Sequence, residues 1–386
     1  MKGVFKMYFE LSEEQKAIRD TAKKFAGERI APVQDADERQ GIFRREIVSE
    51  MGRLGFWGAI IPEEYGGSNI GFLGSVIIME EIARVSASYS GHFVSQTVGP
   101  GLTILRHGTK RQKDRYVPGL VSGDLIGCFA ATEPDAGSDV ASMKTTATRN
   151  EKGFVLNGTK TWITNATVAD ISLVFAYTDK ERKHQGISCF LVDMKESPGI
   201  STRAIEKFGL SCSVAGEIIF QDVQLPPESV LGNLGDGFKI LMEMLNNTRL
   251  FAAARALGVG KTCLEASIKY VKEREQFRQP LSRFQMIQEQ IAEMYIEHEA
   301  SKLLVYQAAL NKDRGKQEAA DVSMAKYSAC EAAVRAADMT LKIFGSYGFS
   351  MEYPVQRFIR DSRAFHITEG TSNIQKIIIA RNLLDL

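Results

Sequence analysis

The chain has 386 residues, of which 44% are hydrophobic and 25% are charged, and its formal net charge is +1. This is the composition of a globular protein long enough for two or three structural units. The near-neutral charge argues against a dedicated nucleic-acid binder, and no run reaches the ~18–20 apolar residues of a membrane span. The N-terminus shows neither a signal-peptide core nor a transit-peptide bias. We therefore expect a cytoplasmic protein of bacterial type.

Cysteine and histidine spacing argues against disulfides and metal sites. The five cysteines are Cys128, Cys189, Cys212, Cys263 and Cys330. Their odd number and the absence of a CxxC pair favour reduced thiols that act as small hydrophobic side chains. The five histidines form no HExxH or similar ligand spacing, so no metal is predicted.

Residues 1–124 have the pattern of a helical domain. Ser12 and Gln15 form a capping box in front of a first helix, and Pro32 is expected to end or bend that helix. Four further helices are expected over residues 43–54, 73–86, 90–105 and 110–121. The helix at 73–86 is apolar on most sides and should be buried.

The hydrophobic period changes near residue 125, where short segments rich in β-branched and aromatic residues begin. Strands are expected over residues 125–132, 144–149, 153–156, 160–164, 171–178, 187–193, 201–206 and 217–223. Asn157-Gly158 is a strong hairpin signal between two of them. Short strands with frequent turns predict a sandwich or barrel, which we place at residues 125–235.

The helical period returns in the third domain, residues 236–386. Long amphipathic helices are expected over residues 238–274, 283–314, 316–344 and 373–384. Short connections between them favour antiparallel neighbours in a bundle. The fold class is therefore α+β, with a helical domain, a small β-domain and a helical bundle in that order.

Three glycine-bearing segments could hold phosphate. Gly258-Val259-Gly260-Lys261-Thr262 ends like a P-loop, but Arg255 stands where a Walker A motif needs glycine, so helix packing is favoured. Residues 232–237 follow no strand of a βαβ unit, which favours a linker over a dinucleotide site. Gly345-Ser346-Tyr347-Gly348 has the composition of a helix C-cap.

A carboxylate near the C-terminus, Glu369, precedes Gly370 and the small polar residues Thr371, Ser372 and Asn373. These three residues are typical of a helix N-cap, and the free N–H groups of a helix start can bind an anion. Glu369 is therefore either a solvated residue at a helix entry or a carboxylate base beside a phosphate-bearing ligand.

Two further segments could form the wall of a ligand site. The hydroxyl-rich loop 132–139 offers backbone and side-chain donors to carbonyl or phosphate groups, although it could equally be a turn between strands. Trp162 and Thr164 alternate along a strand and should share one face. Together they could stack on and hydrogen-bond a planar ring, whereas a strand tryptophan is more commonly a core residue.

Five motifs, in order and in spacing, resemble the acyl-CoA dehydrogenase family. They are Thr132-Glu-Pro-Asp-Ala-Gly-Ser-Asp, Lys160-Thr-Trp-Ile-Thr-Asn, Arg274-Glu-Gln-Phe277, Phe344-Gly-Ser-Tyr-Gly-Phe349 and Glu369-Gly-Thr. The resemblance covers residues 11–384. It implies a helical N-terminal domain, a middle antiparallel β-barrel, a C-terminal four-helix bundle, non-covalent FAD and a homotetramer built as a dimer of dimers.

The resemblance also implies roles for individual residues. Those expected around the flavin ring are Phe129, Ala131, Thr132, Trp162 and Thr164, with Ser138 beside cofactor and thioester. Those expected to reach the FAD of a neighbouring subunit are Arg274, Gln276, Phe277, Lys342, Gly345 and Ser346. Thr371 and Asn373 would hold FAD phosphates, and Asn246, Arg249 and Gly370 would contact the acyl-CoA.

In this resemblance Glu369 takes the place of the catalytic base. It would remove the α-proton of an acyl-CoA thioester while the β-hydrogen leaves as hydride to flavin N5, giving a trans-2-enoyl-CoA. Electron-transferring flavoprotein or a similar carrier would then reoxidise the flavin. The alternatives are a dehydrogenase of acyl groups on a carrier protein, a flavin oxidase or monooxygenase on the same fold, and a non-enzymatic CoA-binding scaffold.

Several positions depart from the family pattern. Lys342 stands where Gln is common, and Asn246 stands where Asp is frequent. Some members carry the base just before the arginine at 249, but that residue here is Thr248, so Glu369 remains the expected base. His92 lies in a segment that often lines the acyl pocket, although a histidine on a helix face is the favoured interpretation.

Overall fold

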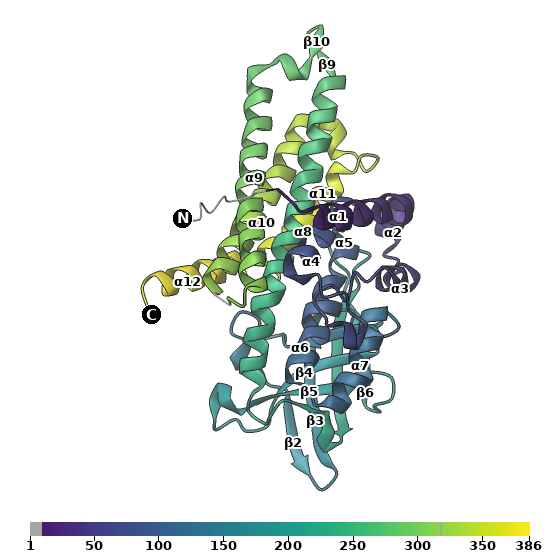
Figure 1. Ribbon diagram of the computed structural model, residues 1–386, viewed down its shortest axis with the longest axis vertical. Coiled ribbons are helices and arrows are strands. Elements are labelled where there is room, and N and C mark those ends of the chain that lie inside the picture. The colour runs from purple at the N-terminus through teal and green to yellow at the C-terminus, as the bar shows by residue number, and fades with distance from the viewer. Residues whose placement is uncertain (1–9, 317–318) are drawn as a thin grey trace, which may run out of the picture.

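The computed structural model describes residues 10–316 and 319–386. Figure 1 shows an elongated molecule in which long helices form one end and a sheet forms the other, with the N-terminal helices along the side. No helix in these residues combines the length and apolarity needed to span a bilayer. All five cysteines are buried and free, as predicted.

The N-terminal domain is helical, as predicted. Its α-helices are α1 (Glu13–Phe25), α2 (Ala31–Gln40), α3 (Arg45–Arg53), α4 (Gly71–Val85), α5 (Ala87–Ser90), α6 (Leu102–His107) and α7 (Lys110–Ser122). Ser12 and Gln15 form the expected capping box. The chain stays helical through Pro32, because a π-helical segment at Ala26–Ile30 precedes it and Pro32 falls in the first turn of α2, where a missing N–H is tolerated.

The single helix expected over residues 90–105 is instead divided. A π-helical segment, Phe93–Gly101, separates α5 from α6 and contains Pro100. Because proline cannot donate a backbone hydrogen bond, a change of helical register at this point is physically reasonable.

Helix α4 joins the first domain to the third. It is buried on nearly all sides and packs against the long helix α8 (Gly237–Glu273). A side chain at Gly258 of α8 would place its Cβ 2.4 Å from the carbonyl oxygen of Glu80 and 2.6 Å from Cβ of Ala83. Gly258 is therefore a packing glycine between helices, which confirms the interpretation favoured over a P-loop.

The middle domain is one sheet of strands in the order β6-β7-β3-β2-β4-β5-β8, with β1 also beside β4. The strands are β1 (Gly127–Ala130), β2 (Thr146–Asn150), β3 (Gly153–Thr164), β4 (Ile171–Tyr177), β5 (Ile187–Asp193), β6 (Ile200–Ala204), β7 (Ala215–Leu225) and β8 (Val230–Leu231). The sheet is not closed, so a barrel is too strict a description. It is mainly antiparallel, although β1 runs parallel to β4.

The prediction of a hairpin turn at Asn157-Gly158 is wrong. Strand β3 continues through these residues, with a register shift against β7. The hairpin turn between β2 and β3 lies at residues 151–152, where Asn150 pairs with Gly153. A Cβ at Gly158 would lie 2.4 Å from Oγ1 of Thr145. The Asn157 amide bonds Asp222 of β7 at 3.0 Å. The pair therefore permits a β-bulge and a close backbone approach.

The predicted C-terminal helices are confirmed as α8, α9 (Gln285–Asp313), α10 (Ala319–Phe344) and α12 (Ser372–Leu383). Helices α8, α9 and α10 pack together, and α12 packs on α10. The sequence interpretation missed α11 (Val355–Arg363) and the two-stranded ribbon of β9 (Glu275–Gln276) and β10 (Gln279–Pro280). This ribbon forms the tip of the helical end, opposite the sheet (Figure 1).

Candidate active site

Glu369 lies in the turn that leads into α12. Its φ is +56° and that of Gly370 is +85°, so both residues adopt the left-handed region, which is costly for a residue with a Cβ. The turn is held by Gln375, whose Nε2 donates to the carbonyl oxygen of Gly370 at 2.9 Å. Buried Lys326 of α10 donates to the same oxygen at 2.9 Å. The strained backbone therefore fixes the direction of the carboxylate.

The carboxylate of Glu369 accepts a hydrogen bond from the hydroxyl of Thr248 on α8. Burial raises the pKa of Glu369, and the Thr248 hydroxyl and the positive charge of Arg249 oppose that rise. Arg249 is itself buried, and its Nε has no hydrogen-bond partner among the described residues. A partly desolvated carboxylate with raised proton affinity is suited to accept a proton from a weak carbon acid.

The loop 132–139 is fixed by a buried ion pair beneath it. Nζ of Lys160 lies 2.9 Å from Oε1 of Glu133 and 3.0 Å from the carbonyl oxygen of Ala131. Burial lowers the pKa of Lys160 to about 8, against the opposing effect of Glu133. Glu133 also accepts the backbone N–H of Thr145 at 3.0 Å. The first residues of the loop are therefore anchored to β3 and to the segment before β2.

Trp162 is placed against this loop but is not a core residue. The N–H of Thr161 donates to the carbonyl oxygen of Thr132 at 2.9 Å, which brings the two predicted wall segments together. Trp162 is 61% exposed, with φ of +59° at a register shift of β3. Ile163 is buried and Thr164 only partly so. An exposed indole beside a hydroxyl-rich loop fits a planar ring and its polar edge.

Other predicted residues lie close in the chain either to the loop or to the Thr248–Glu369 contact. Phe129 and Ala131 lie on or just after β1, and a Cβ at Gly99 would lie 2.9 Å from Cδ1 of Phe129, so this glycine gives the ring room. Ser138 is exposed in the loop. On α8, the side-chain oxygen of Asn246 is buried without a partner among the described residues. Thr371 is the N-cap of α12, and its hydroxyl accepts the N–H of Ile374 at 3.3 Å.

A second group of predicted residues lies at the other end of the molecule. The guanidinium carbon of Arg274 sits 5.3 Å from the centroid of the Tyr347 ring, next to the turn that holds Gly345 and Ser346. Gln276 and Phe277 are exposed at the ribbon tip, Phe277 by 89%, and Lys342 is also exposed. Figure 1 places β9 and β10 opposite β2 and β3. One chain does not bring this group to Trp162.

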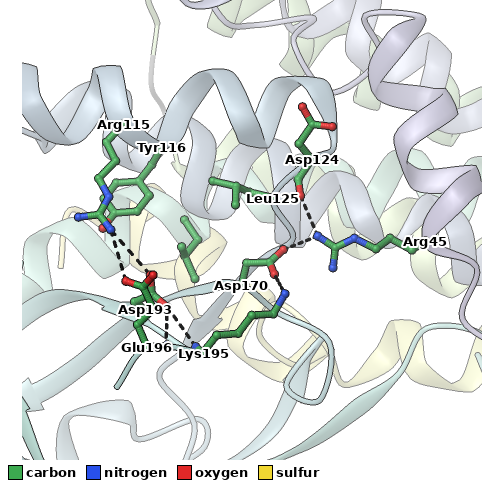
Figure 2. A pocket seen from close by; sticks show the side chains of 10 residues that line it. Arg45, Arg115, Tyr116, Asp124, Leu125, Asp170, Asp193, Lys195 and Glu196 are labelled. Carbon is green, nitrogen blue, oxygen red and sulfur yellow. Dashed lines mark hydrogen bonds and ion pairs between the residues drawn. The ribbon is translucent and has the colours of Figure 1, made fainter. Parts of the chain in front are cut away.

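A separate cleft of about 470 Å³ opens where α3 and α7 meet the sheet. Figure 2 shows Asp170 between Arg45 and Lys195 on its wall. The Asp170 carboxylate lies 2.6 Å from the Arg45 guanidinium and accepts the N–H of Ile126 at 2.7 Å. Its charges are paired with one another, so the cleft is a junction between domains rather than a ligand site.

Residues that sequence reasoning missed support the site from below. Lys326 and Gln375 hold the Glu369 turn, and Lys160 with Glu133 holds the loop. Lys326, Gln375 and Lys160 are polar residues in helix or strand patterns that would otherwise suggest solvent exposure, whereas Glu133 stands in the loop. Lys160 and Glu133 belong to two of the motifs described above, but those motifs do not indicate that the two residues pair.

Comparison with known proteins agrees with this arrangement. The chain matches the N-terminal, middle and C-terminal domains of acyl-CoA dehydrogenase over residues 12–124, 128–223 and 235–384. A glutaryl-CoA dehydrogenase of Desulfococcus multivorans is 44% identical, with 98% of each chain covered. A solved glutaryl-coenzyme A dehydrogenase in complex with glutaryl-CoA has a TM-score of 0.97 at 43% identity, covering 98% of this chain and 97% of that one.

A second similar structure, PigA with FAD and proline, has a TM-score of 0.94 at 32% identity and covers 98% of this chain and 99% of its own. The fold and these similarities thus define a flavin-dependent oxidoreductase. The chain belongs to the acyl-CoA dehydrogenase family, and its cofactor is FAD.

Proposed function

We propose that this protein catalyses the α,β-dehydrogenation of an acyl-CoA thioester to a trans-2-enoyl-CoA, with Glu369 as the base. The observation that carries the proposal is the Glu369 carboxylate, held by Thr248 on a fixed turn, with a pKa raised by burial. The α-proton of a thioester is weakly acidic, so its base needs high proton affinity and fixed geometry.

The turn also supports stabilisation of the enolate that forms. The N–H groups of Ile367 and Thr368 both donate to the carbonyl oxygen of Ala364, whereas the N–H of Glu369 donates to none of the described residues. A backbone donor left free beside the base can bind the thioester oxygen as it gains negative charge. We assign that role to the Glu369 N–H and the surrounding channel to Asn246, Arg249, Gly370 and Ser138.

The residues suited to hold FAD form two groups. Phe129, Ala131, Thr132, Trp162 and Thr164 would hold the flavin ring, and Thr371 and Asn373 at the start of α12 would bind phosphate oxygens. When bound, FAD accepts the β-hydrogen as hydride at N5. Electron-transferring flavoprotein or a similar carrier would take up the electrons.

A second copy of the chain is needed to complete this site. The group at the ribbon tip is Arg274, Gln276, Phe277, Lys342, Gly345 and Ser346, and in one chain it lies at the opposite end from Trp162 (Figure 1). The exposed aromatic and cationic side chains of this group fit a flavin nucleotide bound to another subunit. We therefore propose a homotetramer built as a dimer of dimers.

The test is reduction of bound flavin by acyl-CoA in the absence of oxygen. Wild-type protein should be yellow and should bleach with an acyl-CoA, while Glu369→Gln should bind FAD but not bleach. The matched control is Glu331→Gln, which removes a neighbouring carboxylate that bonds Ser372 at 2.7 Å and should retain bleaching. Bleaching of Glu369→Gln at the wild-type rate would contradict the base assignment, and protein that takes up no FAD would contradict the proposed function.

A further inference from the structure

A buried arginine lies deeper along the helix that contacts the base. Thr248 and Arg255 of α8 are seven residues apart, so with Ala252 they share one helix face. At 1.5 Å per residue, Arg255 starts about 10 Å further along this face than Thr248. It is 8% exposed, and burial lowers its pKa to about 10, so it remains charged at neutral pH.

The guanidinium of Arg255 is positioned but not neutralised. Its Nε donates to the carbonyl oxygen of Ala87 at 2.7 Å, and its carbon lies 5.7 Å from the centroid of the Phe365 ring. Its Nη2 has no hydrogen-bond partner among the described residues. A Cβ at Gly91 would lie 3.0 Å from that nitrogen. The glycine therefore leaves the polar end of Arg255 unobstructed on this side.

The nearby carboxylates are satisfied by other donors. Glu38 accepts the hydroxyl of Ser88 and the N–H of Ser211, the latter at 2.7 Å. Asp361 accepts the N–H of Leu210 at 2.7 Å. Asp361, Glu369 and Glu38 all act on Arg255 through their field, yet none of them hydrogen-bonds it. A buried cation without a bonded anion is costly unless a ligand supplies one.

His92 adds a second unpaired polar group in the same region. It is 1% exposed, and neither ring nitrogen has a partner among the described residues. Burial, with Arg255 as the next contributor, lowers the pKa of His92 to about 3, so the ring is neutral and offers one N–H. The rings of Phe43, Trp57 and Tyr89 surround it. No oxygen or nitrogen atom of the described residues accepts that N–H.

We propose that Arg255, assisted by His92, binds a carboxylate at the far end of the acyl group, so that the substrate is a short ω-carboxyacyl-CoA. This assignment rests on the proposed function, because it places the thioester α-carbon at Glu369. Long side chains on a helix lean toward its N-terminus, which turns the guanidinium back toward Thr248 and the base. The span between base and cation therefore suits a short chain.

Two measurements test the specificity. The rate of flavin bleaching gives kcat/KM for two pairs of thioesters. Glutaryl-CoA is compared with pentanoyl-CoA, and adipyl-CoA with hexanoyl-CoA; the members of each pair have the same number of acyl carbons, and only the first carries a terminal carboxylate. Binding of the same four thioesters to Glu369→Gln, followed by the flavin spectrum, gives affinities without turnover. The carboxylated member of each pair should be preferred in both. Loss of a buried charged hydrogen bond should lower this preference on the order of 100-fold in Arg255→Gln, and less in Arg255→Lys.

The outcomes separate the two proposals. Wild-type flavin that bleaches faster with pentanoyl-CoA than with glutaryl-CoA overturns this inference and leaves the proposed function intact. Equal losses for both thioesters in Arg255→Gln would show that the arginine is structural. If Arg255→Gln does not fold, Gly91→Ala is the alternative variant, because its Cβ would crowd Nη2 of Arg255 and leave the charge in place. It should reduce the preference for the carboxylated thioester over the uncharged one. An unchanged preference overturns the inference. If no acyl-CoA bleaches the flavin, both proposals fail.

Discussion

Thr248 and Glu369 are 121 residues apart in the sequence, yet the hydroxyl of Thr248 donates a hydrogen bond to the Glu369 carboxylate. The contact joins the first half of the 37-residue helix α8 to the turn before α12. The group that hydrogen-bonds the carboxylate of Glu369 is therefore a neutral hydroxyl and not a cation. A substitution at Thr248 can change the proton affinity of Glu369 without changing the charge of the site.

Thr248→Val should shift the pH dependence of flavin reduction. Glu369 acts as a base only when ionised, so activity falls as the pH falls through its pKa. The Thr248 hydroxyl lowers that pKa, and its removal should move the acidic limb of kcat/KM upward by about 1 pH unit. Thr248→Ser keeps the hydroxyl and should leave the limb in place. A valine variant with the wild-type limb would show that the hydrogen bond does not act on the base.

Gly370→Ala should misplace the base. The φ of +85° disfavours any Cβ, and that Cβ would lie 2.8 Å from Nε2 of Gln375, which holds the turn. We expect a loss of about 1–2 kcal/mol in the free energy of unfolding and a larger proportional loss of flavin reduction.

The matched control for this substitution is Gly315→Ala. Gly315 has a similar φ of +76°, but a Cβ there meets nothing within 4 Å. It should lose a similar amount of stability in denaturant unfolding while keeping full activity. Equal activity losses in the two variants would mean that the Gly370 effect is general strain rather than displacement of Glu369.

Asp170→Asn should weaken the junction between the first domain and the sheet. Hydrogen bonds from Lys195, Ile126 and Arg45 hold the pKa of Asp170 below its usual value despite burial. A depressed carboxyl pKa adds stability above the unfolded-state pKa of about 4, and this stability is lost as the pH falls through the folded-state value. The variant should lose about 1–3 kcal/mol at pH 7 and show a shallower loss of stability on acidification.

Denaturant unfolding between pH 7 and pH 3 checks this effect. Asp114→Asn is the control, because Asp114 forms an exposed pair with Lys110 on α7, and such pairs contribute little. If both variants lose the same small amount at pH 7, the cluster around Asp170 is no stronger than a surface pair.

Local signals predicted the helices well because their causes are local. Ser12 and Gln15, three residues apart, form the cap of α1. The helical period of α9 follows from its one buried face. Asn157-Gly158 failed because the same dipeptide that favours a hairpin also permits a β-bulge, and the partner strand β7, some 60 residues further on, decides between them.

The site was predictable only in part. Glu369, Trp162 and the loop 132–139 belong to motifs with a recognisable composition. Lys326 and Gln375 do not, and the motif that contains Lys160 gives that residue no role, because a single polar residue in a helix or strand pattern gives no sign that it points inward. Their roles depend on which elements pack together, and the positions of Arg255 and His92 depend on this in the same way.

The contact of α4 with α8 at Gly258 has a consequence for synthesis of the chain. Helix α4 is apolar on nearly every side, and the glycine that receives it is made about 180 residues later. At roughly 5–20 residues per second, a ribosome needs on the order of 9–36 s to supply that partner. During this interval α4 can pack against α1 but not against α8. The nascent N-terminal segment therefore carries a partly uncovered apolar helix, and we expect translation of this chain to depend on a holding chaperone.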